Sequence, residues 1–320
     1  QSANAHGRPL YGIGIDLKKA FDSISHRGLI KALGARGAGA ATTAIVESWL
    51  AQRTVRPDHG GLGTEVPVSR GIPQGSVWSP VLFTICFEEL SLCWQNSGVR
   101  VQFGPRECDS VKVGGLAFAD DCILVSDSVD ELRAMWARVQ ECVPLWGLEI
   151  APRKCEAIAF LPEGYSAQAS SAARAAMSNF FVGTETDDTR VPYCKTITYL
   201  GNTVHERLSS PVDIVTKFKS RMSAASWCIS AHRAHTVPLV GLKMLSGAAL
   251  PALLYGIEFL HSTDLDEGRP VQVAVNNALR RITGAFTSTH ARVLRAFCGS
   301  FSIKSLYQAA VLRLCARLVH

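Results

Sequence analysis

Three aspartates end apolar runs of the kind that form buried strands. Asp16 closes the run YGIGID, whereas Asp120 and Asp121 lie between the two apolar halves of VKVGGLAFADDCILVS. Adjacent carboxylates repel each other and lose hydration when partly buried, so such a turn is either fully solvated or supplied with a cation. An isolated Asp-Asp pair favours the solvated turn, because aspartate is common in turns. If Asp16 ends a neighbouring strand, the three acids would hold two divalent ions for phosphoryl transfer, and oxygen ligands favour Mg²⁺.

The elements that must position these acids mix strands with helices. Hydrophobic periodicity and capping residues locate their boundaries, for example Ser128 and Glu131 in a capping box. The predicted elements are strands within 11–16, 148–161 and 195–204, a hairpin over 111–126, helices over 26–37, 41–53 and 128–147, and a long helix after the loop at 70–80. Residues 162–192 predict a solvated insertion with one weak helix, and the chain beyond about residue 211 predicts helices almost throughout. This order indicates an α+β core followed by a helical domain.

Composition favours a folded protein with a basic C-terminal third. The chain has 320 residues, 47% of them apolar and 19% charged, which is enough apolar material for one large or two modest domains. Residues 217–320 contain 13 Lys and Arg against 4 Asp and Glu, which suits a polyanionic partner as well as an ordinary solvated helix surface. The ten cysteines form no C-x-x-C pair and predict buried reduced thiols. No run approaches the roughly 20 apolar residues of a membrane span and no signal-peptide pattern begins the chain, so we expect an intracellular protein without a membrane partner.

Five segments of the chain occur in the order of the reverse-transcriptase motifs lettered A to E, and each resembles its motif. They are most similar in character to enzymes of non-LTR, LINE-like retrotransposons, in which A-F-D, P-Q-G-S and F/Y-A-D-D are typical. The resemblance covers about residues 10 to 205. The five segments are DLKKAFDSI (16–24), RGIPQGSVWSP (70–80), FADD (118–121), GLEIAPRKCE (147–156) and YLG (199–201).

The resemblance implies a polymerase fold of the α+β class. Residues 1–205 would form the palm, an antiparallel sheet with packed helices, together with partial fingers at about 23–70. Residues 206–320 would form an all-α thumb or C-terminal region. In the family, a fingers segment with triphosphate-binding Arg and Lys residues precedes the first catalytic strand, whereas this chain begins almost at that strand. We therefore expect an N-terminally truncated enzyme whose partners include the remainder of a retrotransposon polyprotein.

The resemblance also assigns roles to the acids and to one lysine. Asp16 and Asp120 match the principal ligands of two Mg²⁺ ions, with Mn²⁺ as an alternative, and Asp121 matches the third acid. One ion would lower the pKa of the primer 3′-hydroxyl, and the other would bind the triphosphate and stabilise the leaving pyrophosphate. Lys154 matches the lysine that protonates this leaving group, although Arg153 beside it is equally consistent with a solvated basic turn.

Further positions match the family's contacts with nucleotide, template and primer. The backbone after Asp16 would cradle phosphates, and the aromatic ring of Phe21 would exclude a 2′-hydroxyl; without the motif, Phe21 would be interpreted as a core residue. A loop would contact the template base and the incoming nucleotide, with Arg70 supporting it, touching phosphate or lying on the surface. Trp78, where a smaller aliphatic residue is commoner, is predicted to fill the core. The expected substrate-binding residues are Leu17, Phe21, Arg70, Pro73, Gln74 and Gly75, and the expected primer grip is Tyr199, Leu200 and Gly201.

The function implied by the resemblance is that of an RNA-directed DNA polymerase core from a non-LTR retrotransposon. It would extend a primer 3′-hydroxyl with deoxynucleoside triphosphates on an RNA template, and basic C-terminal helices would contact the RNA–DNA hybrid through its phosphates. A nuclear location would follow from a retrotransposon origin. Two alternatives stay open: a catalytically silent nucleic-acid-binding remnant with a palm-like fold, and a related enzyme such as a group II intron maturase or a telomerase-like protein.

Overall fold

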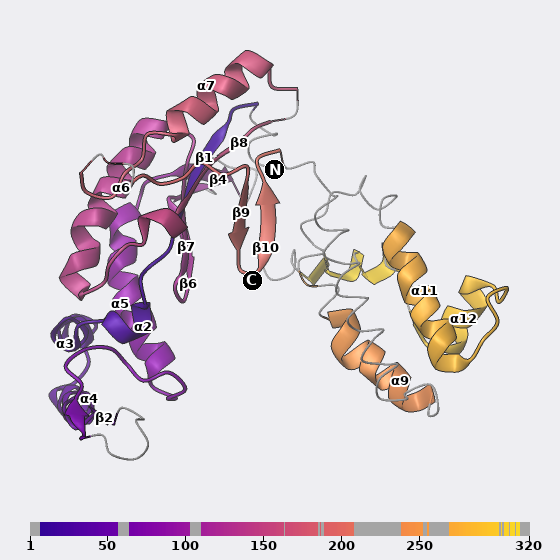
Figure 1. Ribbon diagram of the computed structural model, residues 1–320, viewed down its shortest axis with the longest axis horizontal. Helices are drawn as coiled ribbons and strands as arrows, with labels where there is room; N and C mark the ends of the chain where they lie inside the picture. The colour runs from indigo at the N-terminus through magenta and orange to yellow at the C-terminus, as the bar shows by residue number, and fades with distance from the viewer. Residues whose placement is uncertain are drawn as a thin grey trace. The chain divides into compact units, whose positions relative to one another are not determined.

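A computed structural model shows the chain as two compact units, Gln1–Leu208 and Ser209–His320 (Figure 1). Each unit is described by itself. The residues that the structure describes are 7–56, 64–102, 110–162, 164–184, 186, 189–207, 238–251, 255, 269–300, 302, 304–306, 308–310 and 312–313.

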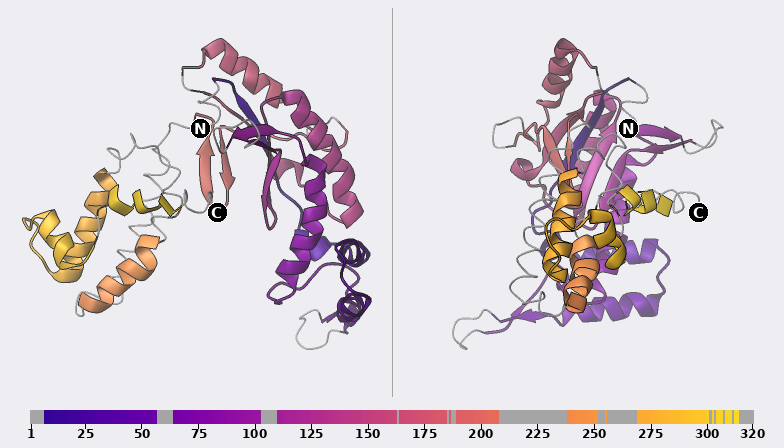
Figure 2. Two further views of the ribbon diagram at one scale, coloured as in Figure 1. Left: turned by 180° about the vertical axis from the view of Figure 1, so that it is seen from behind. Right: turned by 90° about the vertical axis from the view of Figure 1, so that its right-hand side faces the viewer.

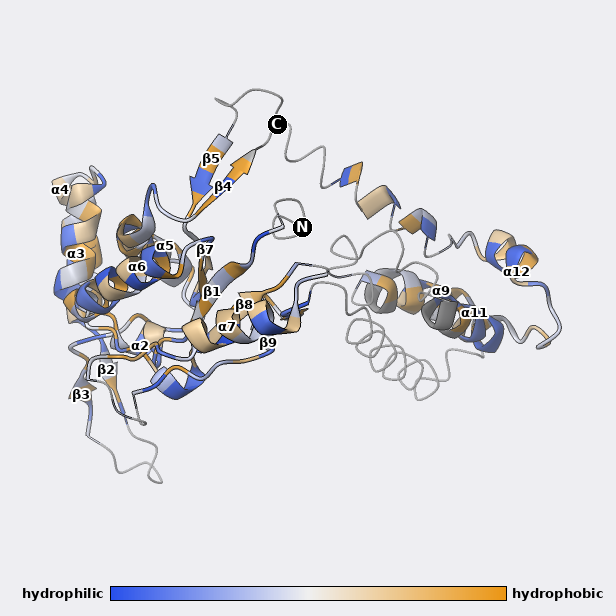
Figure 3. Ribbon diagram, turned by 90° about the horizontal axis from the view of Figure 1, so that it is seen from above, coloured by the Kyte–Doolittle hydropathy of each residue, from blue (hydrophilic) through white to orange (hydrophobic). Residues whose placement is uncertain are grey.

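A four-stranded antiparallel sheet forms the centre of the first unit. Its strand order is β6-β7-β1-β8, with the first strand of the chain between β7 and β8. The strands are β1 (Leu10–Ile15), β6 (Gly115–Phe118), β7 (Asp121–Ser126) and β8 (Glu156–Phe160). Colouring by hydropathy marks β7 and much of β1 as apolar (Figure 3), as expected for strands covered on both faces. The predicted α+β class with an antiparallel sheet is confirmed.

Helices cover one face of this sheet. Leu124 and Ala157 are buried on that face with Leu132 and Met135 of α6, in the main hydrophobic core. Ser25 and Ser128 cap α3 and α6 by accepting from backbone N–H groups, as their sequence positions predict. The helices are α2 (Ala20–Ser23), α3 (His26–Ala35), α4 (Ala40–Ala51), α5 (Ser79–Ser91), α6 (Val129–Cys142) and α7 (Ala167–Met177), with 3-10 turns η1 (Leu92–Trp94), η3 (Val143–Trp146) and η4 (Pro152–Lys154).

A β-hairpin covers the opposite face of the sheet (Figures 1 and 2). Its strands β9 (Thr196–Tyr199) and β10 (Asn202–His205) pair around a two-residue turn, so the single strand predicted over 195–204 is wrong. Ile197 of β9 packs with Ile123 and Ile158. A Cβ on Gly14 would lie 2.8 Å from Cδ1 of Ile197. Glycine in YGIGID therefore lets the hairpin approach the backbone of β1 closely.

Two further sequence predictions for the first unit are corrected. The hairpin predicted over 111–126 is confined to β6 and β7, because β5 (Ser110–Val113) pairs with β4 (Val99–Gln102) in a separate ribbon. The insertion predicted to be solvated at 162–192 contains α7 and contributes Met177, Phe180 and Val191 to the main core. Its alanine-rich composition hid this role, since alanine is common on both buried and solvated helix faces. A small ribbon, β2 (Thr54–Val55) with β3 (Val66–Pro67), completes the first unit.

The described part of the second unit is helical, as predicted. Helix α9 (Pro238–Met244) continues into a π-helical turn, η5 (Leu245–Ala249). Helices α11 (Arg269–Thr283) and α12 (Ala291–Phe297) follow, and Leu279, Ile282 and Leu294 are buried between them. The start of the basic C-terminal third, residues 217–237, lies outside the described residues. Within the described residues, no helix combines the length and apolar character that crossing a bilayer requires.

Candidate active site

Asp16 lies at the end of β1, on a backbone held from one side. Beyond Ile15 the chain continues to pair: Leu17 bridges Ile150, and the Asp16 carbonyl accepts from the N–H of Ala151 at 2.9 Å. The N–H of Asp16 donates to Cys155 Sγ at 3.4 Å. The position of Asp16 is therefore fixed by its backbone, which leaves its side chain available for chemistry.

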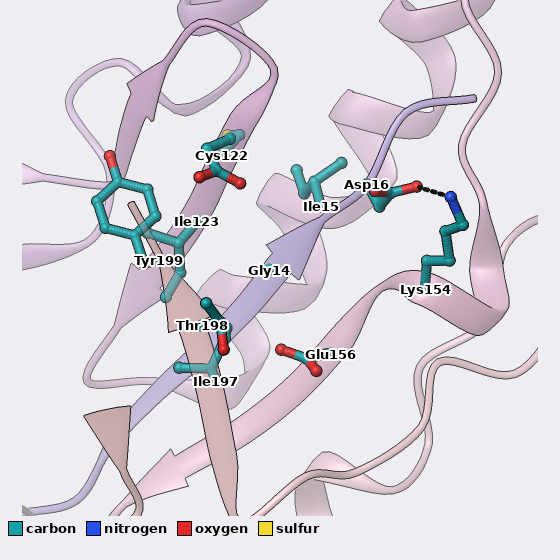
Figure 4. Close-up of a pocket in the computed structure, with 11 residues that line it drawn as sticks. Gly14, Ile15, Asp16, Cys122, Ile123, Lys154, Glu156, Ile197, Thr198 and Tyr199 are labelled. Atoms are coloured by element: carbon teal, nitrogen blue, oxygen red, sulfur yellow. Dashed lines mark ion pairs between the residues drawn. The ribbon is translucent and has the colours of Figure 1, made fainter. Parts of the chain in front are cut away.

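A pocket of about 180 Å³ opens where β1, β7, β8 and β9 meet (Figure 4). Ile15 pairs with Cys122 in the sheet register, so the next residue pair along these strands is Asp16 and Asp121. Glu156 of β8 adds a third carboxylate to the lining. The lining residues are Gly14, Ile15, Asp16, Asp121, Cys122, Ile123, Lys154, Glu156, Ile197, Thr198 and Tyr199. Of the predicted catalytic residues, the pocket brings together Asp16, Asp121 and Lys154.

Asp120 lies in the exposed turn between β6 and β7 and is not among the residues that line this pocket. Phe118 pairs with Asp121, which leaves a two-residue turn of Ala119 and Asp120. Ala119 has a φ of 53°, a left-handed conformation that costs a residue with a Cβ about 1 kcal/mol. Strain of this kind tends to occur at functional sites. The role predicted for Asp120 stays a prediction.

The electrostatics of Asp16 favour a cation. Its Oδ2 atom is buried and, among the described residues, has no hydrogen-bond donor. Lys154 Nζ lies 3.7 Å from that oxygen, in an ion pair whose lysine side chain is 73% exposed (Figure 4). A buried carboxylate oxygen without a donor is costly, and a divalent ion would remove that cost.

The donor chemistry of the pocket fits such an ion, because Asp16, Asp121 and Glu156 offer the carboxylate oxygens that Mg²⁺ prefers. Within the described residues, however, no three Asp, Glu, His or Cys side chains are grouped closely enough to hold one ion. A metal site here would therefore need side-chain rearrangement or oxygens from a substrate.

The β9–β10 turn is attached to the pocket through Asp121. Asp121 Oδ2 accepts a hydrogen bond from the Leu200 N–H at 3.2 Å. Tyr199 lines the pocket, and burial, together with the nearby Cys122 thiol and Asp121 carboxylate, raises its pKa above the ordinary tyrosine value. All three residues of the predicted primer grip thus lie in or next to this turn, and Gly201 has a φ of 71°.

The predicted nucleotide-binding loop is docked against α2. The N–H groups of Gly71 and Ile72 donate to the carbonyls of Ile24 and Phe21 at 2.8 and 2.7 Å. The Gly71 carbonyl accepts from the side chains of His26 and Arg53. The loop is anchored at Gly71 and Ile72, and the residues that follow lie nearer the surface. Pro73 is half-buried, whereas Gln74, Gly75 and Arg70 are exposed.

Phe21 is half-buried and stacks on Phe83, with ring centroids 4.4 Å apart and planes inclined by 14°. It packs against the main core and does not line this pocket, so its role at the sugar stays a prediction. The prediction for Trp78 is wrong, because this side chain is 48% exposed. Helix α5 buries Leu82, Phe83 and Cys86, and Trp78 lies before its first residue.

Sequence reasoning missed two kinds of pocket residue. Glu156 and Thr198 line the pocket. Strand alternation from Ile158 offers only a weak signal for Glu156 and none for Thr198. Cys122 and Cys155 were assigned as ordinary buried thiols but lie directly at the site. Burial raises the pKa of Cys122 to about 12 and that of Cys155 to about 11, which keeps both thiols neutral. Neutral thiols act here as small packing groups.

Comparison with known proteins agrees with this geometry. The family described as reverse transcriptase (RNA-dependent DNA polymerase) matches residues 1–204. The chain is 30% identical over 158 residues to the Pol polyprotein of the type-1 retrotransposable element R2 from Nasonia vitripennis, covering 48% of this chain and 15% of that protein. It is 22% identical over 287 residues to the RNA-directed DNA polymerase from mobile element jockey of Drosophila melanogaster, covering 86% of this chain and 29% of that protein.

Solved telomerase structures are also similar. Telomerase from Candida albicans, in complex with a TWJ fragment of telomeric RNA, shares 11% identity at a TM-score of 0.43, over 94% of this chain and 51% of that one. The chain spans only 15% and 29% of the length of the R2 and jockey relatives. Because the family match covers more than half of the chain and includes Asp16, Asp121 and Lys154, the chain belongs to the reverse transcriptase family, in its LINE-like, non-LTR branch.

Proposed function

We propose that this chain carries the RNA-directed DNA polymerase core of a non-LTR retrotransposon. It extends a primer 3′-hydroxyl with deoxynucleoside triphosphates on an RNA template. The observation that supports this most directly is the juxtaposition of Asp16, Asp121 and Lys154 in one pocket of a chain that belongs to the family. Residues 1–205 act as palm with partial fingers, and 206–320 act as the helical thumb. The remainder of a retrotransposon polyprotein would be a further partner.

Asp16, Asp120 and Asp121 are the residues that would hold the metal, as two Mg²⁺ ions or alternatively Mn²⁺. When bound, such ions lower the pKa of the primer hydroxyl and neutralise the leaving pyrophosphate. The orphaned Oδ2 of Asp16 supports this role, because a carboxylate without a donor is ready to accept a cation. Asp120 on its exposed turn would complete the set once substrate phosphates are present.

The other residues bind, orient and move protons. Lys154 keeps its ammonium group within 3.7 Å of Asp16, from where it donates a proton to the leaving pyrophosphate oxygen. The backbone at Leu17, fixed by its bridge to Ile150, lies against the triphosphate. Phe21 limits space at the sugar. The exposed loop Pro73, Gln74 and Gly75, with Arg70 before it, contacts the template base and nucleotide, and Tyr199, Leu200 and Gly201 hold the primer end.

A second candidate function is a catalytically silent nucleic-acid-binding remnant. Two observations favour it: the described residues contain no ready three-ligand metal group, and Asp120 lies away from the pocket lining. Both observations are also compatible with an active polymerase whose side chains rearrange when substrate binds. The family match then makes polymerase activity the better supported proposal.

Primer extension on an RNA template separates the two. The wild-type chain should extend a DNA primer with deoxynucleotides, and Asp120→Asn should reduce extension by at least about a hundredfold, as losing a ligand of a catalytic ion does. Binding of an RNA–DNA hybrid by both proteins is the control for folding. If the wild-type chain binds hybrid but extends it no better than Asp120→Asn, the remnant interpretation holds instead.

A further inference from the structure

The hydrogen bond between Asp121 and Leu200 joins two segments that are 79 residues apart in the sequence. It connects the first residue of β7 to the turn between β9 and β10. Both segments border the pocket, because Asp121 and Tyr199 are among its lining residues. The bond therefore crosses from the sheet that carries the acids to the hairpin that packs on that sheet.

The turn itself is conformationally expensive. Leu200 and Gly201 have φ values of 48° and 71°, so both occupy the left-handed region. A two-residue hairpin turn of this type favours Asn-Gly or Gly-Gly, because a leucine Cβ is strained there by about 1 kcal/mol. Surrounding contacts must hold Leu200 in this conformation, and the charge-assisted bond to Asp121 is a contact of suitable strength.

The rest of the hairpin is fixed in a different way. Ile197 packs against Ile123 and Ile158, over the bare backbone at Gly14. These apolar contacts set how closely β9 approaches the sheet, but they are not directional. A directional contact at the turn is needed to fix where the backbone of Tyr199, Leu200 and Gly201 lies relative to Asp16.

We propose that Asp121 is a positioning residue for the Tyr199–Asn202 turn. Its Oδ2 atom accepts from the Leu200 N–H and fixes the turn beside the pocket that the Asp121 side chain also lines. Because the turn holds the primer end in the proposed function, on which this inference rests, Asp121 sets the distance between the primer terminus and the acids. The feature required for this role is the hydrogen-bond acceptor, and the negative charge strengthens its bond.

Hydrogen exchange of the 320-residue chain in metal-free buffer tests the proposal without relying on activity. Asp121→Ala removes the acceptor, whereas Asp121→Asn keeps a carbonyl oxygen in nearly the same place. Exchange at the Leu200 amide should rise by about tenfold or more in Asp121→Ala, as expected for loss of a hydrogen bond to a charged group, and by much less in Asp121→Asn. Asp120→Ala, one residue away on the exposed turn, is the matched control and should leave exchange at Leu200 unchanged. Thermal unfolding of each variant verifies that it folds.

A second measurement follows the primer end. A primer with a fluorescent base at its 3′-terminus is bound to each variant in buffer that contains EDTA. The fluorescent base should be more mobile when the primer is bound to Asp121→Ala than when it is bound to Asp121→Asn. If the Leu200 amide exchanges equally in the wild type and Asp121→Ala, or if Asp121→Asn loosens the turn as much as Asp121→Ala, the positioning role is refuted. If Asp121→Ala loosens the turn but the wild-type chain extends no primer, the role of Asp121 in positioning the turn is preserved and the proposed function is refuted.

Discussion

At the scale of single residues, the charge of Asp16 is incompletely compensated in the pocket. Its buried Oδ2 has no donor in the described structure, and the ammonium of Lys154 is 3.7 Å away, too far for a hydrogen bond. Such a site lowers the folding stability of the metal-free protein and raises its affinity for a cation. Backbone strain of the kind found at functional sites occurs at Lys19, Ala119 and Leu200, which have φ values of 43°, 53° and 48°.

This arrangement predicts that Asp16→Ala changes the unfolding free energy in opposite directions with and without metal. At a Mg²⁺ concentration about tenfold above its dissociation constant, the wild-type chain should gain about 1.4 kcal/mol of unfolding free energy, and Asp16→Ala should gain none. Without metal, the variant should be at least as stable as the wild type, because it lacks the buried oxygen that has no hydrogen-bond donor. Thermal unfolding with and without Mg²⁺ measures both effects. Asp130→Ala, a 91% exposed acid on α6, is the control, and an equal metal shift in Asp16→Ala would count against the site.

At the scale of elements, glycine positions determine how loops and strands approach one another. Gly71 has a φ of 80°, and a Cβ there would lie 2.5 Å from the backbone oxygen of Asp22. Gly75 in the same loop has a φ of 86° but would place its Cβ in open space. A side chain at Gly75 would incur only the cost of a left-handed backbone, whereas a side chain at Gly71 would also incur a steric clash.

Gly71→Ala should therefore destabilise the chain more than Gly75→Ala does. Both substitutions incur a backbone cost of about 1 kcal/mol. Gly71→Ala should lose at least about 2 kcal/mol more, because the N–H of Gly71 is bonded to Ile24 and the loop cannot retreat without losing that bond. Urea unfolding midpoints at constant slope measure the difference. Equal losses in the two variants would show that the loop is free to lift away from α2.

A buried ion pair ties α7 to the end of the β9–β10 hairpin. The Glu206 side chain is 4% exposed and accepts from Arg174 Nε and Nη2 at 3.0 and 2.6 Å. Tyr193 donates its hydroxyl to the same carboxylate at 2.7 Å. Burial alone would raise the pKa of Glu206, but the hydrogen bonds from Arg174 and Tyr193 outweigh it, so the pKa lies below the ordinary value. The stability that this lowered pKa contributes is present above the unfolded-state pKa and is lost as the pH falls through the folded-state pKa.

Arg174→Ala should cost about 3 kcal/mol at pH 7, because it leaves the Glu206 carboxylate buried and unpaired. The loss should shrink as the pH falls toward about 4, because the unpaired carboxyl can then become protonated, and Arg174→Ala combined with Glu206→Gln should recover part of it at pH 7. Chemical denaturation at both pH values measures these differences. Arg56→Ala, which breaks the exposed pair with Glu65, is the control and should cost less than about 1 kcal/mol. A loss in Arg174→Ala that does not vary with pH would refute the ion-pair explanation.

The sequence predicted these elements unevenly, and the reasons are physical. Local signals located the strand ending at Asp16, the capped helices at Ser25 and Ser128 and the β6–β7 turn. Spatial neighbours far apart in the chain carry no local signal, which is why Glu156 in the pocket and the Leu200 bond to Asp121 were not foreseen. The juxtaposition of Asp16 with the Asp-Asp turn came from family resemblance alone, since hydrophobic periodicity does not specify which strands pair.

At the scale of the whole molecule, each unit has its own buried residues. The described main core of the first unit runs from Ile13 to Val191, and the separate cluster of Ile123, Ile158 and Ile197 also lies before residue 208. The second unit buries Leu279, Ile282 and Leu294 and contains the whole of residues 217–320, which have 13 Lys and Arg against 4 Asp and Glu. The proposed catalytic residues and the basic surplus are thus carried by different units.

This separation predicts that a chain of residues 1–208 folds and keeps its Mg²⁺-dependent stabilisation but binds hybrid with a weaker dependence on salt. Each Lys or Arg that neutralises a phosphate releases a counterion, so loss of the basic unit should reduce the slope of log affinity against log salt concentration. Four removed arginines in contact with phosphates, such as Arg280, Arg281, Arg292 and Arg295, would reduce that slope by about 3 to 4. Fluorescence anisotropy between 50 and about 200 mM salt, the range over which counterion release is usually resolved, measures it. Equal slopes for the two chains would place the phosphate contacts in the first unit, whereas a short chain that unfolds without cooperativity would show that its core depends on the second.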